Sequence, residues 1–413
     1  MAGEWKTVTL RDALGAKGYI RGPFGSALRR PELKSSGIPV YEQQHAITGT
    51  REFRFYIDEE KYSTLRRFAV QPNDLIVSCS GTLARVSMIR EEDPVGIISQ
   101  ALLILRPDTS VVWPKYLYYF MSSKRGYDSL VGVSTGSVQV NIAGRSVIEQ
   151  TELPLPPLPH QRAIACILGA LDDKIELNRQ MNETLEQIAQ AIFKKWFIEP
   201  TKNGKLPEGW REDSIYLAAD VIYGAPFSSA KFNTKKIGKP LIRIRNLANE
   251  SPDVFTPEIH PKGYLVKPGD IVVGMDGEFR AYIWGGEKSW LNQRLCVFIP
   301  KPGFSAPYVL YSITRPLAEV EATETATTVI HLGKNDIDRF KIIIAPDKIL
   351  ASFNRIAEPL FKRIVLNKQK SRTLAALRDS LLPKLISGEL RVPDAEKICA
   401  RGASALGGME KCS

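Results

Sequence analysis

The longest regular pattern in the chain is a helical stripe of apolar residues that lies between two clusters of proline. Between residues 161 and 197 there is no proline and only one glycine. Apolar side chains recur there at alternating spacings of four and three, which is the a/d seam of a coiled coil over about five heptads. The spacing predicts a single helix of about 55 Å. Its central seam positions are Leu171, Ile175, Asn178, Asn182 and Leu185.

A second stripe with the same spacing follows 189 residues later. Two such stripes in one chain predict two long helices that pack as an antiparallel coiled coil, and polar seam residues fix register at some cost in stability. As a spacer between two globular parts, the rod would span at most about sixteen base pairs of B-DNA. Pro359 and Pro383 should kink or interrupt the second helix. Its central seam positions are Leu360, Ile364, Asn367, Leu374 and Leu381, with Ser371 as a second polar residue.

The segments that precede the two stripes repeat each other. FAVQPNDLIVSCSG from Phe68 matches YLVKPGDIVVGMDG from Tyr264, and apolar strand-like runs follow at Ile98 and Leu291. Short alternating runs of this kind predict β-strands. We therefore predict an α+β fold of two β-rich α/β domains in tandem repeat, separated by the two long helices. The expected boundaries are 1–158, 159–199, 200–346 and 347–392, with a disordered tail at 393–413.

Composition narrows the class of protein. The chain has 413 residues, a formal net charge of +11 and five scattered cysteines. The cysteine usage is typical of reduced thiols in a cytoplasmic protein, and no apolar run is long enough for a membrane span, so we expect no membrane partner. A basic excess favours nucleic acid as a partner. However, residues 347–392 alone carry ten basic against four acidic side chains, so much of the excess lies on the second helix.

Catalytic motifs are not found in the sequence. It lacks a GxxxxGK[ST] phosphate loop, a GxGxxG fingerprint, a GxSxG elbow and the (N/D)PP(Y/F) tetrapeptide of amino-methyltransferases. Its histidines and cysteines have no metal-ligand spacing. We expect no catalytic residue, metal site or bound cofactor on this chain. Two alternatives stay open: a nuclease or methyltransferase with an unrecognised site, and a nucleic-acid-binding scaffold without sequence preference.

Loops that contain glycine recur at matched places in both repeats. Loops with Gly, Ser, Thr and Arg can approach a phosphate backbone, although each can also be an ordinary tight turn. Arg243 and Arg245 alternate in LIRIRNL and should share one strand face, which is either solvated or presented to nucleic acid. The candidate DNA-binding residues are Ser26, Arg29, Ser80, Thr82, Arg85, Ser137, Gln139, Arg243, Arg245, Asn246, Glu278, Arg280, Tyr282 and Lys334.

The helical segments resemble a known family. LPLPPLPHQRAIACILGALDDKIELNRQMNETLEQIAQAIFKKWF is similar to the central helical region of specificity subunits of type I restriction–modification systems, and RTLAALRDSLLPKLISGEL to their C-terminal helical region. GPFGSAL, PNDLIVSCSGT and PGDIVVGMDGE resemble elements of their two target recognition domains. The resemblance spans residues 5 to 392. His160 departs from it, because the family usually has Glu there.

The resemblance implies that DNA recognition, modification and cleavage belong to different subunits. Each target recognition domain would read one half of a split, asymmetric sequence in double-stranded DNA, and the helices would set the gap between the halves. The helices would also dock two modification subunits, which carry S-adenosylmethionine and methylate adenine N6. Restriction subunits that use ATP and Mg would join for cleavage. Since the loops of the two domains differ, we expect them to read different half-sites.

Overall fold

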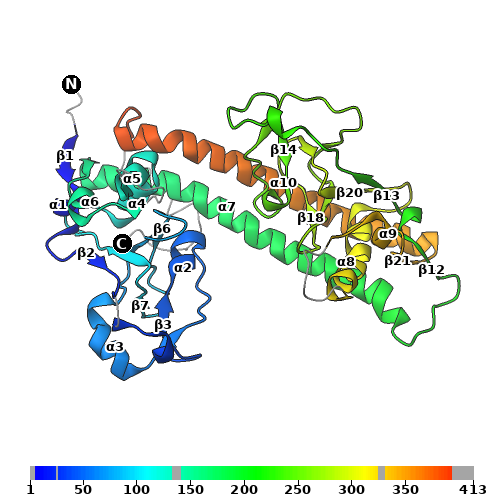
Figure 1. Cartoon of the computed structure of the whole chain (residues 1–413), viewed down its shortest axis with the longest axis horizontal. Helices are drawn as coiled ribbons and strands as arrows, with labels where there is room; N and C mark the ends of the chain where they lie inside the picture. Colours follow the sequence, from blue (N-terminus) through cyan, green and yellow to red (C-terminus); the bar gives the residue numbers. More distant parts are fainter. Residues whose placement is uncertain (1–4, 25–26, 133–140, 324–330, 393–413) are drawn as a thin grey trace. The chain divides into compact units, whose positions relative to one another are not determined.

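The computed structural model describes residues 5–24, 27–132, 141–323 and 331–392, which form two compact units (Figure 1). Unit 1 combines residues 1–172 with 376–413, and unit 2 is the continuous segment 173–375. The boundary passes through both long helices, so each unit contains a part of each helix. The predicted tail at 393–413 lies outside the described residues.

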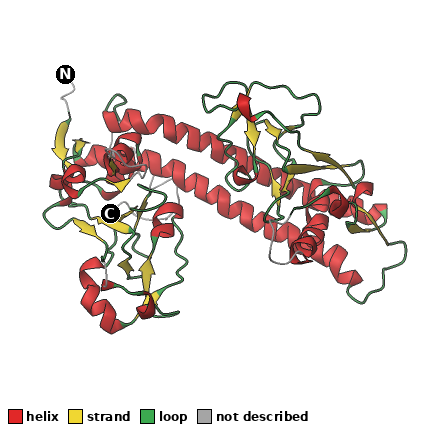
Figure 2. Ribbon diagram, in the orientation of Figure 1, coloured by secondary structure: helices red, strands yellow, loops and turns green. Residues whose placement is uncertain are grey.

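Unit 1 contains short strands and helices packed on its part of the long helices (Figure 2, strands in yellow). An antiparallel sheet has the order β2–β8–β5–β6, and a smaller sheet has the order β4–β3–β7 with β3 and β7 parallel. β1 pairs with β11, and β9 pairs with β10. The strands are β1 Lys6–Thr9, β2 Tyr19–Arg21, β3 Ile38–Tyr41, β4 Tyr56–Ile57, β5 Leu75–Ser78, β6 Val86–Met88, β7 Ile97–Ile98, β8 Leu102–Leu105, β9 Val131–Gly132, β10 Asn141–Ile142 and β11 Glu152–Leu155. The short helices are α1 Leu10–Leu14, α2 Gln43–Thr48, α3 Glu59–Leu65, α4 Pro114–Ser122, α5 Lys124–Leu130 and α6 Arg145–Glu149.

Unit 2 repeats this arrangement. Its sheets have the orders β13–β20–β17–β18 and β15–β14–β19–β16, with β14 and β19 parallel, and β12 pairs with β21. The fourth strand of the smaller sheet, β16, corresponds in unit 1 to a single bridge between Ala69 and Ile97. The strands are β12 Arg211–Ser214, β13 Ala219–Tyr223, β14 Lys239–Ile242, β15 Phe255–Thr256, β16 Leu265–Val266, β17 Ile271–Gly274, β18 Ala281–Ile283, β19 Ser289–Leu291, β20 Leu295–Pro300 and β21 Lys341–Ile344. The short helices are α8 Ala306–Thr323 and α9 Lys334–Ile337.

The shared Pro-x-Asp motif has a structural role in both units. Asp74 accepts a hydrogen bond from the backbone N–H of Gln71 at 2.8 Å and pairs with Arg106 at 2.7 Å. Asp270 accepts bonds from the backbone N–H of Lys267 and from the Tyr264 hydroxyl, both at 2.9 Å. Burial raises the pKa of both carboxyls, and these bonds offset part of that rise. The motif therefore caps the turn that leads into the central strand, β5 or β17.

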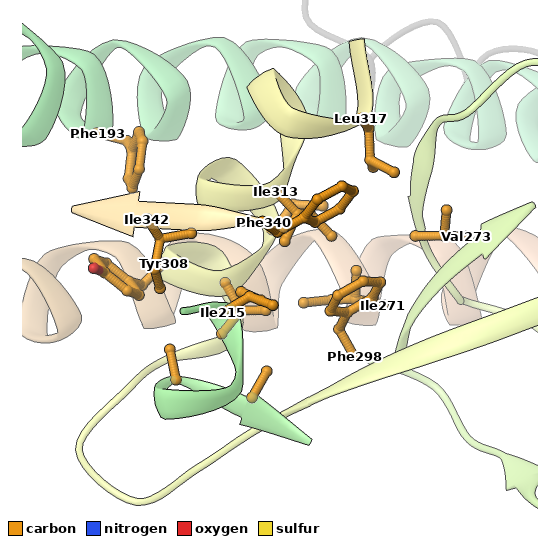
Figure 3. Packing of buried hydrophobic residues seen from close by; sticks show 14 of the residues in the cluster. Phe193, Ile215, Ile271, Val273, Phe298, Tyr308, Ile313, Leu317, Phe340 and Ile342 are labelled. Atoms are coloured by element: carbon orange, nitrogen blue, oxygen red, sulfur yellow. The ribbon is translucent and has the colours of Figure 1, made fainter. Parts of the chain in front are cut away.

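The core of each unit includes both long helices. In unit 2, Phe193 of α7 packs in one core with Tyr308 of α8 and with the strand residues Phe298 and Ile342 (Figure 3). Phe353 of α10 belongs to the same core. In unit 1, residues of the other helix ends, including Leu168 and Leu385, pack with α4 and with β5 and β8. Neither core is complete without the helices, because their apolar faces supply a part of its side chains.

The two ends of the described chain meet within unit 1. The ring of Trp5 lies against Gly388, just after α10, and the Arg391 guanidinium lies 4.8 Å from the centre of that ring. Val392 is buried in the same core. Unit 1 is thus assembled from the first and last segments of the chain.

The long helices are α7 Leu158–Phe193 and α10 Asp347–Ser387. A π-helical turn, Lys194–Ile198, and a 3₁₀ turn, Glu199–Thr201, follow α7. The prediction that Pro359 and Pro383 interrupt the second helix is wrong, because α10 is continuous through both. Both prolines are exposed, so the hydrogen bond that each removes is lost away from the packed side of the helix.

The seam between the helices is antiparallel, as predicted. In unit 2, Asn178 Nδ2 donates to Ser371 Oγ at 3.1 Å, and Asn367 Nδ2 donates to Asn182 Oδ1 at 2.9 Å. An offset of 189 residues maps Asn178 onto Asn367 and Asn182 onto Ser371, so one pair repeats the other. In unit 1, the seam position Arg378 pairs with Asp172 at 2.6 Å. All the apolar seam residues named above are buried or half-buried.

The Asn182–Asn367 pair generates a prediction about stability. Replacing either residue alone with leucine leaves the buried amide of the other without its partner, so each single substitution should destabilise the chain by about 1–3 kcal/mol. The double replacement removes both amides and should be close to neutral or stabilising. Denaturant unfolding followed by helical circular dichroism measures the coupling. Additive losses would contradict the pairing.

Candidate nucleic-acid interface

In each unit, three segments converge at one end of the larger sheet; we call this the loop edge. In unit 1 they are residues 22–24 with 27–29, 79–85 and 99–101, and in unit 2 they are 224–231, 275–280 and 292–294. Gly22 N–H donates to Leu102 O at 3.0 Å, and Gly224 N–H donates to Leu295 O at 2.9 Å. The second and third segments are joined by Cys79 N–H to Ala101 O at 2.8 Å, and in unit 2 by a matching bond between Met275 and Arg294 at 3.0 Å. These backbone contacts of the loop edge therefore recur in both units.

A glycine is required where the first segment crosses the third. A Cβ atom on Gly22 would lie 2.0 Å from Ser99 O, and one on Gly224 would lie 1.9 Å from Asn292 O. Real side chains do not approach a carbonyl oxygen so closely, so only glycine permits this crossing. The loose sequence match between GPFGSAL and GAPFSSA thus reflects a shared backbone contact.

The second segment of unit 1 carries three of the predicted DNA-binding residues on a loop that hydrogen bonds fix in place. The Ser78 hydroxyl donates to Thr82 O at 2.6 Å and accepts from Arg85 N–H at 2.9 Å. Gln43 of α2 hydrogen-bonds to the Ser80 carbonyl, and the Ser80 hydroxyl donates to Gln43 Oε1 at 3.0 Å. Ser80, Thr82 and Arg85 are all exposed, as is Arg29 of the first segment. No sequence motif pointed to Gln43, because it holds the loop from a different element.

The helix that carries Gln43 is anchored by a buried histidine. His45 Nδ1 accepts from Glu42 N–H at 2.7 Å, Nε2 lies 3.0 Å from Glu52 O, and the ring stacks on Phe53. Burial lowers the pKa of His45, which favours the neutral imidazole that this bonding requires. His45 is thus a core residue whose ring nitrogens are both hydrogen-bonded.

The second segment of unit 2 presents a different set of side chains. Glu278 and Arg280 are exposed and pair with each other at 3.2 Å, while Phe279 between them is buried in the core. Tyr282 is half-buried on β18, and Lys334 is the exposed first residue of α9. Ser26, Ser137 and Gln139 lie outside the described residues.

The expectation for Arg243 and Arg245 is wrong. β14 ends at Ile242, and a 3₁₀ turn, Ile244–Asn246, follows, so the two arginines do not share a strand face. A short alternating run such as LIRIRNL is compatible with a strand or with a turn. The side chain of Asn246 favours the turn, because it caps it. The buried Asn246 accepts from Arg243 N–H at 3.0 Å, which assigns its side chain to the fold rather than to a DNA contact.

Arg243 is also held inside unit 2. It pairs with Asp253 at 2.6 Å, and its guanidinium lowers the pKa of that carboxyl to about 2. Asn246 donates to the same carboxylate at 3.2 Å. Arg245 is the exposed member of the group. Among Arg243, Arg245 and Asn246, Arg245 is therefore the one whose side chain is exposed and has no ion pair among the described residues.

Other kinds of site find little support in the described part of the chain. No group of three or more His, Cys, Asp or Glu side chains there could hold a metal ion. Burial raises the pKa of the Cys79 thiol to about 11 and that of Cys296 to about 12, so neither is a ready nucleophile. Among these residues, no helix combines the length and the apolar composition that crossing a membrane requires.

Comparison with known proteins decides the family. The family described as "Type I restriction modification DNA specificity domain" matches residues 4–187 and 221–375. The chain belongs to this specificity family. The two matches end at nearly equivalent points of α7 and α10, in agreement with the tandem repeat. Membership favours DNA recognition over a nuclease or methyltransferase with an unrecognised site.

Individual members of the specificity family resemble the chain over much of its length. The type I restriction enzyme MjaIX specificity subunit of Methanocaldococcus jannaschii is 31% identical over 361 residues, covering 79% of this chain and 81% of that protein. The EcoBI specificity subunit of Escherichia coli is 30% identical over 214 residues, covering 49% and 44%. The crystal structure of a type I S subunit from M. genitalium shares the fold, with a TM-score of 0.54 at 15% identity over 92% of this chain and 96% of that one.

The glycine crossings should be the least replaceable positions of the loop edge. Gly22→Ala and Gly224→Ala each place a methyl group against a backbone carbonyl that has no flexible side chain to give way. Each should lower the thermal midpoint by several degrees, since the sheet end must shift (about 1–3 kcal/mol). The control is Gly144→Ala, where nothing lies within 4 Å of the added atom. Equal midpoints for all three variants would disprove the steric argument.

Proposed function

We propose that this chain is the DNA-recognition subunit of a type I restriction–modification enzyme and that each unit reads one half of a split target in double-stranded DNA. The observation that carries the proposal is the double occurrence of the specificity domain, each copy with its own loop edge. Relatives of the chain are named specificity subunits of type I restriction enzymes. A recognition surface in each unit accounts for the repeat.

The two half-sites should differ. At matched places of the loop edge both units carry an arginine, Arg85 or Arg280, but unit 1 has Ser80 and Thr82 where unit 2 has Asp276 and Glu278. The backbone contacts are shared and these polar side chains are not, so the two surfaces offer different donors and acceptors to base edges. This difference supports an asymmetric target.

The chemistry of modification and cleavage is assigned to partner subunits in the cytoplasm. In this proposal, modification subunits bind S-adenosylmethionine and methylate adenine N6, and restriction subunits use ATP and Mg. This chain itself binds no cofactor and contributes the choice of sequence. The length of the helices, about 55 Å, sets an upper bound on the gap between the two half-sites.

A second matched pattern on the long helices supports the docking of two copies of one partner. Leu177, Thr184 and Ile188 of α7 have counterparts 189 residues later in α10, and all six side chains are exposed. The hydroxyls of the two threonines bond back to the carbonyl four residues earlier, at 3.0 and 3.2 Å. We call each set an outer stripe. The α10 stripe consists of Leu366, Thr373 and Leu377.

A basic residue precedes each outer stripe by one helical turn, Lys174 on α7 and Arg363 on α10, and both are exposed. Exposed apolar groups that recur with a charged neighbour are typical of a protein-binding surface. Because the stripes are equivalent, each suits the same partner surface, an apolar face with an acidic group beside it. We assign the stripes to the two modification subunits, one on each.

Exchange of one recognition unit tests the central proposal. Replacement of residues 208–346 by those of another family member should change one half of the methylated sequence and leave the other half and the spacing unchanged. Replacement of residues 1–158 should change the other half. The readout is the methylated motif in cells that also express the modification subunit.

Two outcomes of that experiment would contradict the proposal. A change in both halves after a single exchange would exclude independent recognition by the two units. Methylation or cleavage of DNA by the purified chain alone would favour the enzyme alternative, and diffuse protection in footprinting with the modification subunit would favour the non-specific scaffold.

Charged substitutions test the outer stripes. Leu366→Asp with Leu377→Asp should remove one of two modification subunits, and Leu177→Asp with Ile188→Asp should remove the other, because a buried unpaired carboxylate is costly in an apolar contact. Native mass spectrometry of the assembled complex counts the copies. The control is Ala376→Asp, at an exposed position beside Leu377 on the same helix. Retention of both copies in either double variant would place docking elsewhere.

A further inference from the structure

The loop edge of unit 2 contains a charged cluster formed by three segments that are distant in sequence. Asp276 follows β17, Arg294 precedes β20 and His331 precedes α9. His331 Nδ1 lies 2.7 Å from Asp276 Oδ1, and Arg294 Nε lies 3.6 Å from Asp276 Oδ2. A backbone bridge between Asp276 and His331 holds two of the segments together. The carboxylate of Asp276 thus faces both basic side chains, Arg294 and His331.

The exposure of the three side chains shows how the cluster is arranged. The Arg294 side chain is 54% exposed and that of His331 is 46% exposed, whereas that of Asp276 is 26% exposed. The carboxylate is the least accessible member, and one of its oxygens is directed at Arg294 and the other at His331. Arg294 uses Nε toward the carboxylate, and its Nη1 lies 3.5 Å from His331 Nδ1. Neither terminal nitrogen has a carboxylate partner among the described residues.

We propose that Arg294, positioned by Asp276 and His331, is a base-reading residue of unit 2 and hydrogen-bonds to a guanine in the major groove. This inference rests on the proposed function and names a specificity-determining residue for it. The terminal nitrogens of an arginine match O6 and N7 of guanine in a bidentate contact, which no other base offers. Asp276 restricts the rotation of the guanidinium before DNA is bound, which lowers the entropy that binding must remove.

The neighbouring carboxylate also explains why the contact is to a base rather than to a phosphate. Asp276 neutralises much of the charge of Arg294 and would repel a phosphate group nearby, so this pair is poorly suited to a purely electrostatic backbone contact. Hydrogen bonds from the guanidinium to the acceptors of a base edge do not depend on net charge in the same way. The Glu278–Arg280 pair differs, because both partners are about two-thirds exposed and, among the described residues, their side chains pair only with each other.

Among its described residues, unit 1 has no counterpart of this cluster. The positions that match Asp276, Arg294 and His331 are Ser80, Ala101 and Ile142, none of which carries a charge. The matches follow from the repeated loop, from the shared Gln100 and Gln293, and from the 189-residue offset before α6 and α9. The proposed guanine therefore belongs to the half-site that is read by unit 2.

The test uses the full chain expressed with its modification subunit and a plasmid library in which every base of the target is varied. Methylation of each library member is read by sequencing. Arg294→Ala should abolish the preference at one G·C pair of the unit 2 half-site, a loss of discrimination of about five- to 150-fold, and should leave the other positions unchanged. Arg294→Lys keeps the charge without the planar fork and should lose most of the same preference.

Asp276→Asn tests the positioning role. It keeps the size of the side chain but removes the charge that orients Arg294, so discrimination at the same base pair should fall, by less than in Arg294→Ala. The control is Arg315→Ala on α8, an exposed arginine paired with Glu319, which should leave the methylated motif unaltered. The thermal midpoints of all variants are compared so that a folding defect is recognised.

Three outcomes would overturn the inference: an unchanged motif for Arg294→Ala, a loss of preference in the half-site read by unit 1, or a uniform loss of methylation that Arg294→Lys restores. The last of these identifies a phosphate contact. Failure of the proposed function is distinct, because the unsubstituted complex would then show no split sequence preference at all.

Discussion

The packing of both long helices into the core of each unit is the interaction on which the structure depends. Phe193 and Phe353 supply unit 2 with aromatic side chains, and Leu168 and Leu385 serve unit 1 in the same way. The helices therefore do more than connect or separate the units, since without them each sheet would leave an apolar face exposed to water.

Patterns that extend over many residues could be predicted from the sequence, and short ones could not. The seam is defined by about five heptads, so its antiparallel pairing and its polar pairs follow from periodicity. The continuity of α10 through Pro359 depends on which side of the helix faces water, and the turn after Ile242 depends on a hydrogen bond made by Asn246. The Asp276, Arg294 and His331 cluster could not be predicted, because only the tertiary fold brings its segments together.

The repeat separates what must stay the same from what can differ. Gly22 and Gly224 permit the same backbone crossing, and Asp74 and Asp270 cap the same turn, so the path of the chain at the loop edge is set by buried or sterically confined groups. The side chains exposed on that path carry little of the folding free energy. A surface of this design can change its chemistry without a change in its support.

The assembly of unit 1 from both ends of the chain has a consequence for the order of folding. Unit 2 is a continuous segment and can close its core as soon as residue 375 has been synthesised. Unit 1 lacks Leu385 and the contact of Trp5 with Gly388 until the last described residues leave the ribosome. Its first 172 residues are then present but incomplete throughout synthesis of the rest. We therefore expect the second unit to fold first during translation, and the amino-terminal unit to be exposed to chaperones and proteases for longer.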